Sequence, residues 1–459
     1  MGKITDQLAS FVAELEYEAL PDEVTERAKR LLLDLSGIII RARNDAESTP
    51  SLISAVEKLG LTGGECSVLG DKHQYAPSAA ALINGTLAHS LDFDDTHAEG
   101  SIHSSAPIVP AAMAAAEMTG ASGKELIAAV VAGYEVQIRL SMALNPSAHY
   151  AQGFHPTATC GVFGAAAAVS KLLGLNAEGV RNAFGIALSQ AAGSMEFLVD
   201  GAWTKRSHVG QAAQNGLMCA VLAAEGFIGP KEAFEGRAGL FSAYSPVSEP
   251  DKAVEALGST WETLRLAVKP YPSCRYSHAA IDGIVSLMSE NDIDPADIEE
   301  MEIGLPETGW KIIGGPDDKT NPAGVVDAQF SMPFCAAVAA RAGGLSWDDY
   351  DRHLSDEKTR DLTRRIKVIV DPQAEAEFPA NMAGVTRIRT KSGSFETFVA
   401  EPKGEPGNFL NDDEFRRKFG DLAAPYLGQG ETDRLADALL SLEQANTISS
   451  VLALGQGQG

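Results

Sequence analysis

A change of hydrophobic period near residue 262 constrains the fold of this chain more than any other feature. Through the first 260 residues apolar side chains recur at helical spacing, beginning with Val24, Ala28 and Leu31 after the start signal Leu20-Pro21-Asp22. Several of these segments are apolar around most of their circumference, so they belong inside a helical domain. The period predicts further helices over 76–91, 106–119, 122–143, 156–173, 176–191 and 207–225.

Beyond residue 262 alternating apolar and polar residues predict strands. The strands are expected at 264–270, 300–305, 366–370, 385–390 and 395–399, with a hairpin turn at 391–394. Helical patterns return at 274–289, 327–342, 411–422 and 431–443. We therefore expect a large helical domain of residues 1–262 with 404–459, and an α+β domain of residues 263–403.

The charge of the chain disfavours two classes of partner. Lys plus Arg number 37 against 62 Asp plus Glu, and a net charge of -25 repels phosphate backbones and anionic lipid. Apolar runs are broken before they reach the ~18 residues of a membrane span, and no targeting signal opens the chain. The 5 cysteines are scattered without a C-x-x-C pair. We expect a cytoplasmic protein that binds neither nucleic acid nor membrane.

An acidic cluster follows the helix expected at 76–91. Asp92, Asp94 and Asp95 lie within four residues and precede His103. The cluster could be a solvated helix end. Alternatively, Asp94-Asp95-Thr-His-Ala-Glu99 is close to an aspartate-rich motif that holds Mg²⁺ for diphosphate chemistry. That alternative needs a second acidic motif on a facing helix, which the late helices do not offer.

Three later segments carry basic side chains in places suited to bind an anion. In the first, a histidine precedes the proline that starts a helix. In the second, a run of basic residues lies in a loop flanked by Gly and Trp. In the third, an arginine and a histidine occupy the first turn of a helix. Each segment alone could equally be a capping or surface feature. The residues are His155, then Lys205, Arg206 and His208, then Arg275 and His278.

Motifs for several other chemistries are missing. No G-x-G-x-x-G follows a strand, and Walker A, H-E-x-x-H and G-x-S-x-G patterns do not occur. Nicotinamide, flavin, ATP and serine-hydrolase chemistry therefore lose support.

In their order and spacing, these segments together resemble the MmgE/PrpD family. The family includes 2-methylcitrate dehydratase, cis-aconitate decarboxylase and iminodisuccinate epimerase, and the resemblance covers almost the whole chain. The segments that carry it are Gly85-Thr-Leu-Ala-His-Ser-Leu-Asp92-Phe-Asp-Asp-Thr96 with His103, Gly153-Phe-His155-Pro-Thr, Lys205-Arg-Ser-His208, Phe234-Glu-Gly-Arg-Ala-Gly-Leu-Phe241 and Tyr271-Pro-Ser-Cys-Arg-Tyr-Ser-His278.

The resemblance implies a mainly α fold, with a large all-α domain built from both chain ends and a smaller α+β lid domain. It also implies a homodimer, and an active site with no required metal or other cofactor. The chain departs from the family pattern at Ser104, where many relatives have proline after the histidine, and at Phe334, where an aromatic hydroxyl is common. The implied active-site residues are Asp92, Thr96, His103, His155, Lys205 and His278.

The chemistry expected from this resemblance is the movement of a proton on a carbon next to a carboxylate. Lys205, Arg206, His208 and Arg275 can bind the carboxylates of a small di- or tricarboxylate, and Asp92 can orient His103. We expect a cofactor-independent lyase, most simply a hydro-lyase of the 2-methylcitrate or citrate dehydratase type. An iminodisuccinate-type epimerase and a cis-aconitate-type decarboxylase stay open, as does the magnesium-dependent diphosphate enzyme.

Overall fold

The computed structural model describes residues 3–315 and 319–457, and the chain divides into two compact units. The first unit comprises Met1–Ala267 and Asn411–Gly459, and the second comprises Val268–Leu410. Helices make up most of the first unit, whereas the second combines helices with a four-stranded sheet. The mainly α fold with a smaller α+β part is confirmed.

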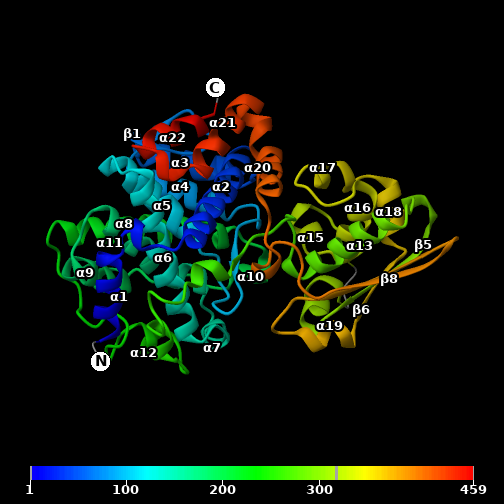
Figure 1. Ribbon diagram of the computed structural model, residues 1–459, viewed down its shortest axis with the longest axis horizontal. Helices are drawn as coiled ribbons and strands as arrows, with labels where there is room; N and C mark the ends of the chain where they lie inside the picture. The colour runs from blue at the N-terminus through cyan, green and yellow to red at the C-terminus, as the bar shows by residue number, and fades with distance from the viewer. Residues whose placement is uncertain (1–2, 316–318, 458–459) are drawn as a thin grey trace. The chain divides into compact units, whose positions relative to one another are not determined.

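The first unit is built around α8, which packs against α5, α6, α9 and α11. The carboxyl-terminal helices return to this unit, and Figure 1 shows them in orange to red beside the blue α2. Its helices are α1 (Ile4–Glu14), α2 (Asp22–Asp45), α3 (Thr49–Lys58), α4 (Pro77–Ala88), α5 (Ser105–Thr119), α6 (Gly123–Leu144), α7 (Pro146–Ala151), α8 (Pro156–Leu172), α9 (Ala177–Leu188), α10 (Phe197–Asp200), α11 (Thr204–Ala224), α12 (Leu240–Tyr244), α20 (Asp412–Leu427), α21 (Gln429–Leu440) and α22 (Ile448–Leu452).

Two glycines let α4 and α11 approach more closely than larger residues would allow. A Cβ atom on Gly210 would lie 2.2 Å from Oγ1 of Thr86, and one on Gly85 would lie 2.8 Å from the Cα of Gly210. Neither position has room for a side chain. The crossing brings the carboxyl end of α4 to the amino end of α11, where Lys205 lies.

One helix, α6, is long and apolar enough to cross a membrane by length and composition. Every residue of its apolar window is buried inside the first unit, which is the pattern of a core helix. Its start is fixed by a capping box, in which Ser122 and Glu125 satisfy each other's backbone N–H groups.

The first unit also contains two small sheets within its helical framework. In one, β1 (Thr62–Ser67) pairs with β2 (Gln74–Tyr75); in the other, β3 (Thr96–His97) pairs with β4 (Leu266–Ala267). The strand predicted over 264–270 was therefore wrong in extent. A 3₁₀ turn at Glu262–Arg265 takes up its beginning, and only β4 is extended and paired.

The second unit is organised on a sheet of order β6-β5-β7-β8. The strands β5 and β6 are parallel, with Met301 opposite Ile366, and the other pairs are antiparallel. The strands are β5 (Ile298–Leu305), β6 (Ile366–Val370), β7 (Gly384–Thr390) and β8 (Gly393–Val399), and the helices are α13 (His278–Glu290), α14 (Glu307–Gly309), α15 (Val325–Gln329), α16 (Met332–Ala342), α17 (Asp349–His353), α18 (Glu357–Thr363) and α19 (Pro372–Glu377).

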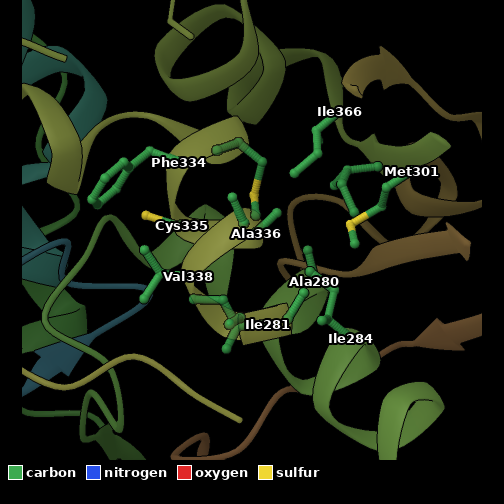
Figure 2. Close-up of a cluster of buried hydrophobic side chains, with 14 of the residues drawn as sticks. Ala280, Ile281, Ile284, Met301, Phe334, Cys335, Ala336, Val338 and Ile366 are labelled. Carbon is green, nitrogen blue, oxygen red and sulfur yellow. The ribbon is translucent and has the colours of Figure 1, made fainter. Parts of the chain in front are cut away.

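The core of the second unit lies between this sheet and two of its helices. Figure 2 shows Ile281 and Ile284 of α13 beside side chains of α16, with Met301 and Ile366 from the strands nearby. Phe334, on α16, is 3% exposed and stacks against Tyr350 at 6.1 Å. Apolar burial of this kind supplies the main driving force for folding of the unit.

Candidate active site

The turn that follows α4 carries the acidic cluster, and its backbone is unusual. Asp92 has a φ of 54°, in the left-handed region that Asp tolerates better than most residues. This conformation reverses the chain, and the Asp92 carboxylate meets α11. There Nζ of Lys205 donates a 2.9 Å hydrogen bond to Oδ1 of Asp92.

A buried lysine from the other end of the chain holds the same turn. Nζ of Lys418, on α20, lies 2.6 Å from the Asp34 carboxylate of α2 and donates to the backbone oxygen of Phe93 at 3.3 Å. The Lys418 ammonium also lies 3.8 Å from the centre of the Phe93 ring. Lys418 and Asp34 are both buried, so the turn is anchored by both chain ends.

Asp94, the next acidic residue, lies between two imidazoles. Nδ1 of His89 is 2.7 Å from Oδ2 of Asp94, and Nδ1 of His103 is 3.3 Å from the same oxygen. The rings of His89 and His103 meet edge to face, with centres 4.7 Å apart. Burial alone would raise the pKa of Asp94, but its histidine neighbours outweigh this and hold the pKa well below its ordinary value. Asp94 is therefore ionised.

The third histidine of the group stands at the start of α8. His155 is 3% exposed, and its ring centre lies 6.0 Å from that of His89 and 5.7 Å from that of His208 on α11. Burial, followed by the neighbouring His89 and Lys205, lowers the pKa of His155 well below its ordinary value. His155 is therefore neutral in the unliganded protein.

Burial also lowers the pKa of His208, whereas Lys205 shifts in the opposite direction. Burial disfavours the ammonium, but the Asp92 carboxylate outweighs this and raises the pKa of Lys205. Lys205 keeps 28% of its side chain exposed. The site therefore presents the charged Lys205 ammonium beside the neutral imidazoles of His155 and His208.

Several buried polar atoms here have no hydrogen-bond partner within residues 3–315 and 319–457. A buried polar group without a partner is costly, so such atoms gather where a polar ligand binds. They are Nε2 of His89, Oδ1 of Asp94, Nδ1 of His155, Nδ1 of His208, Oγ1 of Thr96 and Oγ of Ser104, together with Nδ1 of His103, whose contact with Asp94 is the 3.3 Å ion pair.

Asp92, His103, His155, Lys205 and His208 are thus brought together in the first unit, and Thr96 lies in β3. Nη1 of Arg206 instead contacts Oγ of Ser48 at 3.3 Å.

The remaining two predicted residues lie in the second unit. His278 begins α13, where its Nε2 is 3.3 Å from the backbone oxygen of Ser273 and its ring meets Tyr271 edge to face. Arg275 forms a two-point ion pair with Glu405, so an internal carboxylate already occupies its guanidinium group. A role for either residue in substrate binding or catalysis stays a prediction.

The carboxylates of the magnesium alternative do not converge. Asp95 accepts from the backbone N–H of Ser105 at 3.0 Å, Asp94 faces the histidines, and Glu99 pairs with Arg265 on the surface. The described residues therefore do not assemble Asp94, Asp95 and Glu99 into one cation site.

Asp94, rather than the expected Asp92, faces His103, whereas Asp92 binds Lys205. From sequence Asp94 was assigned only to the magnesium alternative, and His89 was not assigned to the site. Both lie inside the segment 85–96, so the same motif contains them. With His103 they place three possible ligand atoms within 4.8 Å of one another. The 2.7 Å separation of His89 and Asp94 is a hydrogen-bond length, and His103 faces the same oxygen at 3.3 Å. We interpret the three as a hydrogen-bonded pair with an ion-pair partner rather than as metal ligands.

Comparisons with known proteins cover the whole chain. The family model of the MmgE/PrpD N-terminal domain matches residues 6–253, and that of the C-terminal domain matches residues 271–444. A cis-aconitate decarboxylase-like protein of Aspergillus oryzae is 30% identical over 100% of this chain and 98% of its own length. The cis-aconitate decarboxylase of Aspergillus terreus is 27% identical over 98% and 95%, and that of Homo sapiens is 26% identical over 100% and 95%. The chain therefore belongs to the MmgE/PrpD family.

Proposed function

We propose that this protein is a lyase that releases CO₂ from a cis-aconitate-like tricarboxylate. The observation that carries the proposal is the group of Asp94, His103, His155 and Lys205, in which an ionised carboxylate, imidazoles and an ammonium meet. The full-length similarity to cis-aconitate decarboxylases supports this choice of reaction.

The reaction needs a cation for the substrate and a proton donor for carbon. When a carboxylate of cis-aconitate leaves as CO₂, its bonding electron pair forms a new double bond. The electrons of the former double bond then collect on the carbon next to another carboxylate, and a proton must be added there. Lys205 can stabilise the developing negative charge, because the Asp92 carboxylate raises the pKa of Lys205 and keeps its ammonium protonated.

We assign proton donation to His103. Asp94 lies 3.3 Å from its Nδ1 and stabilises the imidazolium form, which can donate from Nε2 to carbon. His155 serves as a neutral N–H donor to the developing charge, because burial and the nearby Lys205 ammonium disfavour its protonation. Apo geometry of this kind tightens when the substrate binds.

The same groups also support dehydration, the reaction expected from sequence. An elimination of water needs a base for the carbon proton and an acid for the leaving hydroxyl, and the two imidazoles could fill these roles. A 2-methylcitrate or citrate dehydratase is therefore the second candidate. An epimerase would use one imidazole to take the carbon proton and the other to return a proton to the opposite face.

A substrate panel separates these reactions. Purified protein is mixed with cis-aconitate, citrate, 2-methylcitrate or iminodisuccinate, and products are followed by NMR. Decarboxylation yields CO₂ and a product one carbon shorter, dehydration yields an alkene from a hydroxy acid, and epimerisation changes only configuration. The variant His103→Asn should lose the activity, whereas His73→Asn, which alters a histidine with 63% of its side chain exposed, should keep it. Inactivity toward every substrate in the panel would contradict the proposal.

A further inference from the structure

His89 lies behind the proposed proton donor and is itself sealed from solvent. It follows the last residue of α4, and its side chain is 0% exposed. Its Nδ1 makes the 2.7 Å contact with Oδ2 of Asp94, whose other histidine neighbour is His103. No substrate can reach His89 without displacing its neighbours, so any effect on the reaction must pass through them, and of these Asp94 is the one that His89 hydrogen-bonds.

The electrostatics of the site fix which nitrogen of His89 carries the proton. Burial, outweighing the Asp94 carboxylate, lowers the pKa of His89 to about 4, so the ring is neutral at neutral pH. An ionised Asp94 can only accept, and Nδ1 of His89 must therefore be the N–H that donates to it. Nε2 is then a bare acceptor, and it has no hydrogen-bond partner within the described ranges.

We propose that His89 is a positioning residue that holds the Asp94 carboxylate and withdraws part of its charge from His103. The inference rests on the proposed function, in which His103 donates a proton to carbon. A carboxylate with no second donor would bind the His103 imidazolium too tightly for easy release of that proton. The hydrogen bond from His89 spreads the charge of Asp94 over two partners, so less of that charge acts on His103.

The other charged and titratable groups around this pair come from several elements. His155 begins α8, Lys205 and His208 lie on α11, and Asp92 and Asp95 lie on the turn after α4. Asp34 of α2, paired with Lys418 of α20, also acts on the charge of Asp94. The positive charge of Lys205 disfavours protonation of His89 and His155. A change of pH profile must therefore be compared with a variant that alters Asp94 alone.

The first experiment reads the tautomer and needs no activity. Protein with ¹⁵N-labelled histidine is titrated by NMR between pH 5.5 and 8, and the His89 signals are assigned from their loss in His89→Asn. We expect one ring that stays neutral throughout and carries its proton on Nδ1. A His89 ring that carries its proton on Nε2, or that becomes protonated in this range, would overturn the inference.

The second experiment compares kcat and KM as functions of pH in three variants. His89→Leu removes the donor, Asp94→Asn removes the charge, and His89→Asn keeps a donor near the position of Nδ1. The basic limb of the profile is the fall of kcat/KM at high pH. We expect this limb to move to higher pH in His89→Leu and to lower pH in Asp94→Asn. In His89→Asn it should stay in place. In His89→Leu, kcat should fall about tenfold, part of the ~10²–10⁴ that a positioned proton-transfer group contributes, with KM within about twofold.

A purely structural role for His89 would lower thermal stability and kcat without moving the basic limb, which would contradict the inference. If His89→Leu does not fold, Asp94→Asn and His89→Asn still decide, because an unmoved limb in Asp94→Asn is equally contradictory. If no substrate of the panel reacts, the proposed function fails, whereas the tautomer measurement still tests the arrangement of His89 and Asp94.

Discussion

Replacing Asp95 by Asn should change how the stability of the protein depends on pH. Asp95 is 1% exposed, and burial, followed by the charge of Asp94, raises its pKa from 3.8 to about 8. The folded protein therefore holds this proton at neutral pH, whereas the unfolded chain has released it. The stability that Asp95 contributes is complete below its unfolded pKa and is lost as the pH rises toward 8.

The size of the effect follows from the proton count. Between pH 3.8 and about 8 the folded state binds one proton more than the unfolded state at this site. The free energy of unfolding therefore falls by about 1.4 kcal/mol per pH unit from this group, or about 3 kcal/mol between pH 5.5 and 7.5. Asn cannot ionise, yet its oxygen can still accept from the backbone N–H of Ser105.

Urea unfolding followed by circular dichroism at pH 5.5, 6.5 and 7.5 measures this difference. The free energy of unfolding of Asp95→Asn, relative to that of wild type, should increase by about 3 kcal/mol from pH 5.5 to pH 7.5. His89 and His155 make the free energy of unfolding rise with pH, because each has a lowered pKa and is neutral when folded. Both proteins share this contribution, so it cancels in the difference between them. The control Asp251→Asn alters an exposed carboxylate of the same unit and should run parallel to wild type. A constant difference between Asp95→Asn and wild type would refute the reasoning.

Four further predictions concern the site and its supports. Lys205→Ala should lower kcat/KM by at least ~10²-fold and reduce the thermal shift caused by a tricarboxylate, with an unliganded Tm close to wild type; a collapse of that Tm would make Lys205 structural. Lys418→Met should cost about 3–5 kcal/mol in urea unfolding because Asp34 is left buried and unpaired, and adding Asp34→Leu should recover most of it. Gly210→Ala should lose about 1–3 kcal/mol by forcing α11 away from α4, and an unchanged midpoint would contradict the close crossing. Treatment with EDTA should leave activity unchanged, whereas a loss that Mg²⁺ or Fe²⁺ restores would make His89, Asp94 and His103 metal ligands.

Helices were the most predictable part of the fold. The pattern over 156–173 became α8 at Pro156–Leu172, because Pro156 fixes the start and the apolar period continues to the end. The strand at 264–270 failed because a short run of alternation does not reveal which backbone it will pair with, and only two residues found a partner in β3. The pair β1–β2 carries a Gly-rich sequence with no clear alternation, and it was missed.

The site was predictable only as a set of segments. Periodicity gave no sign that Lys205 would meet Asp92 from 113 positions away, and the resemblance to a family supplied that grouping. His89 was not assigned because complete burial is a property of the tertiary structure, which a short motif does not encode. In the same way, the pairing of Arg275 with Glu405 across 130 positions could not be inferred from an arginine in the first turn of a helix.

The central claim is that this protein adds a proton to carbon after CO₂ has left a cis-aconitate-like substrate. The most direct test is NMR of the reaction with cis-aconitate in D₂O, with CO₂ measured in parallel. The account predicts one CO₂ for each substrate consumed and one deuterium on the product carbon next to a carboxylate, and it predicts that His103→Asn abolishes both. Consumption of cis-aconitate without CO₂, or a product free of deuterium at that carbon, would contradict it.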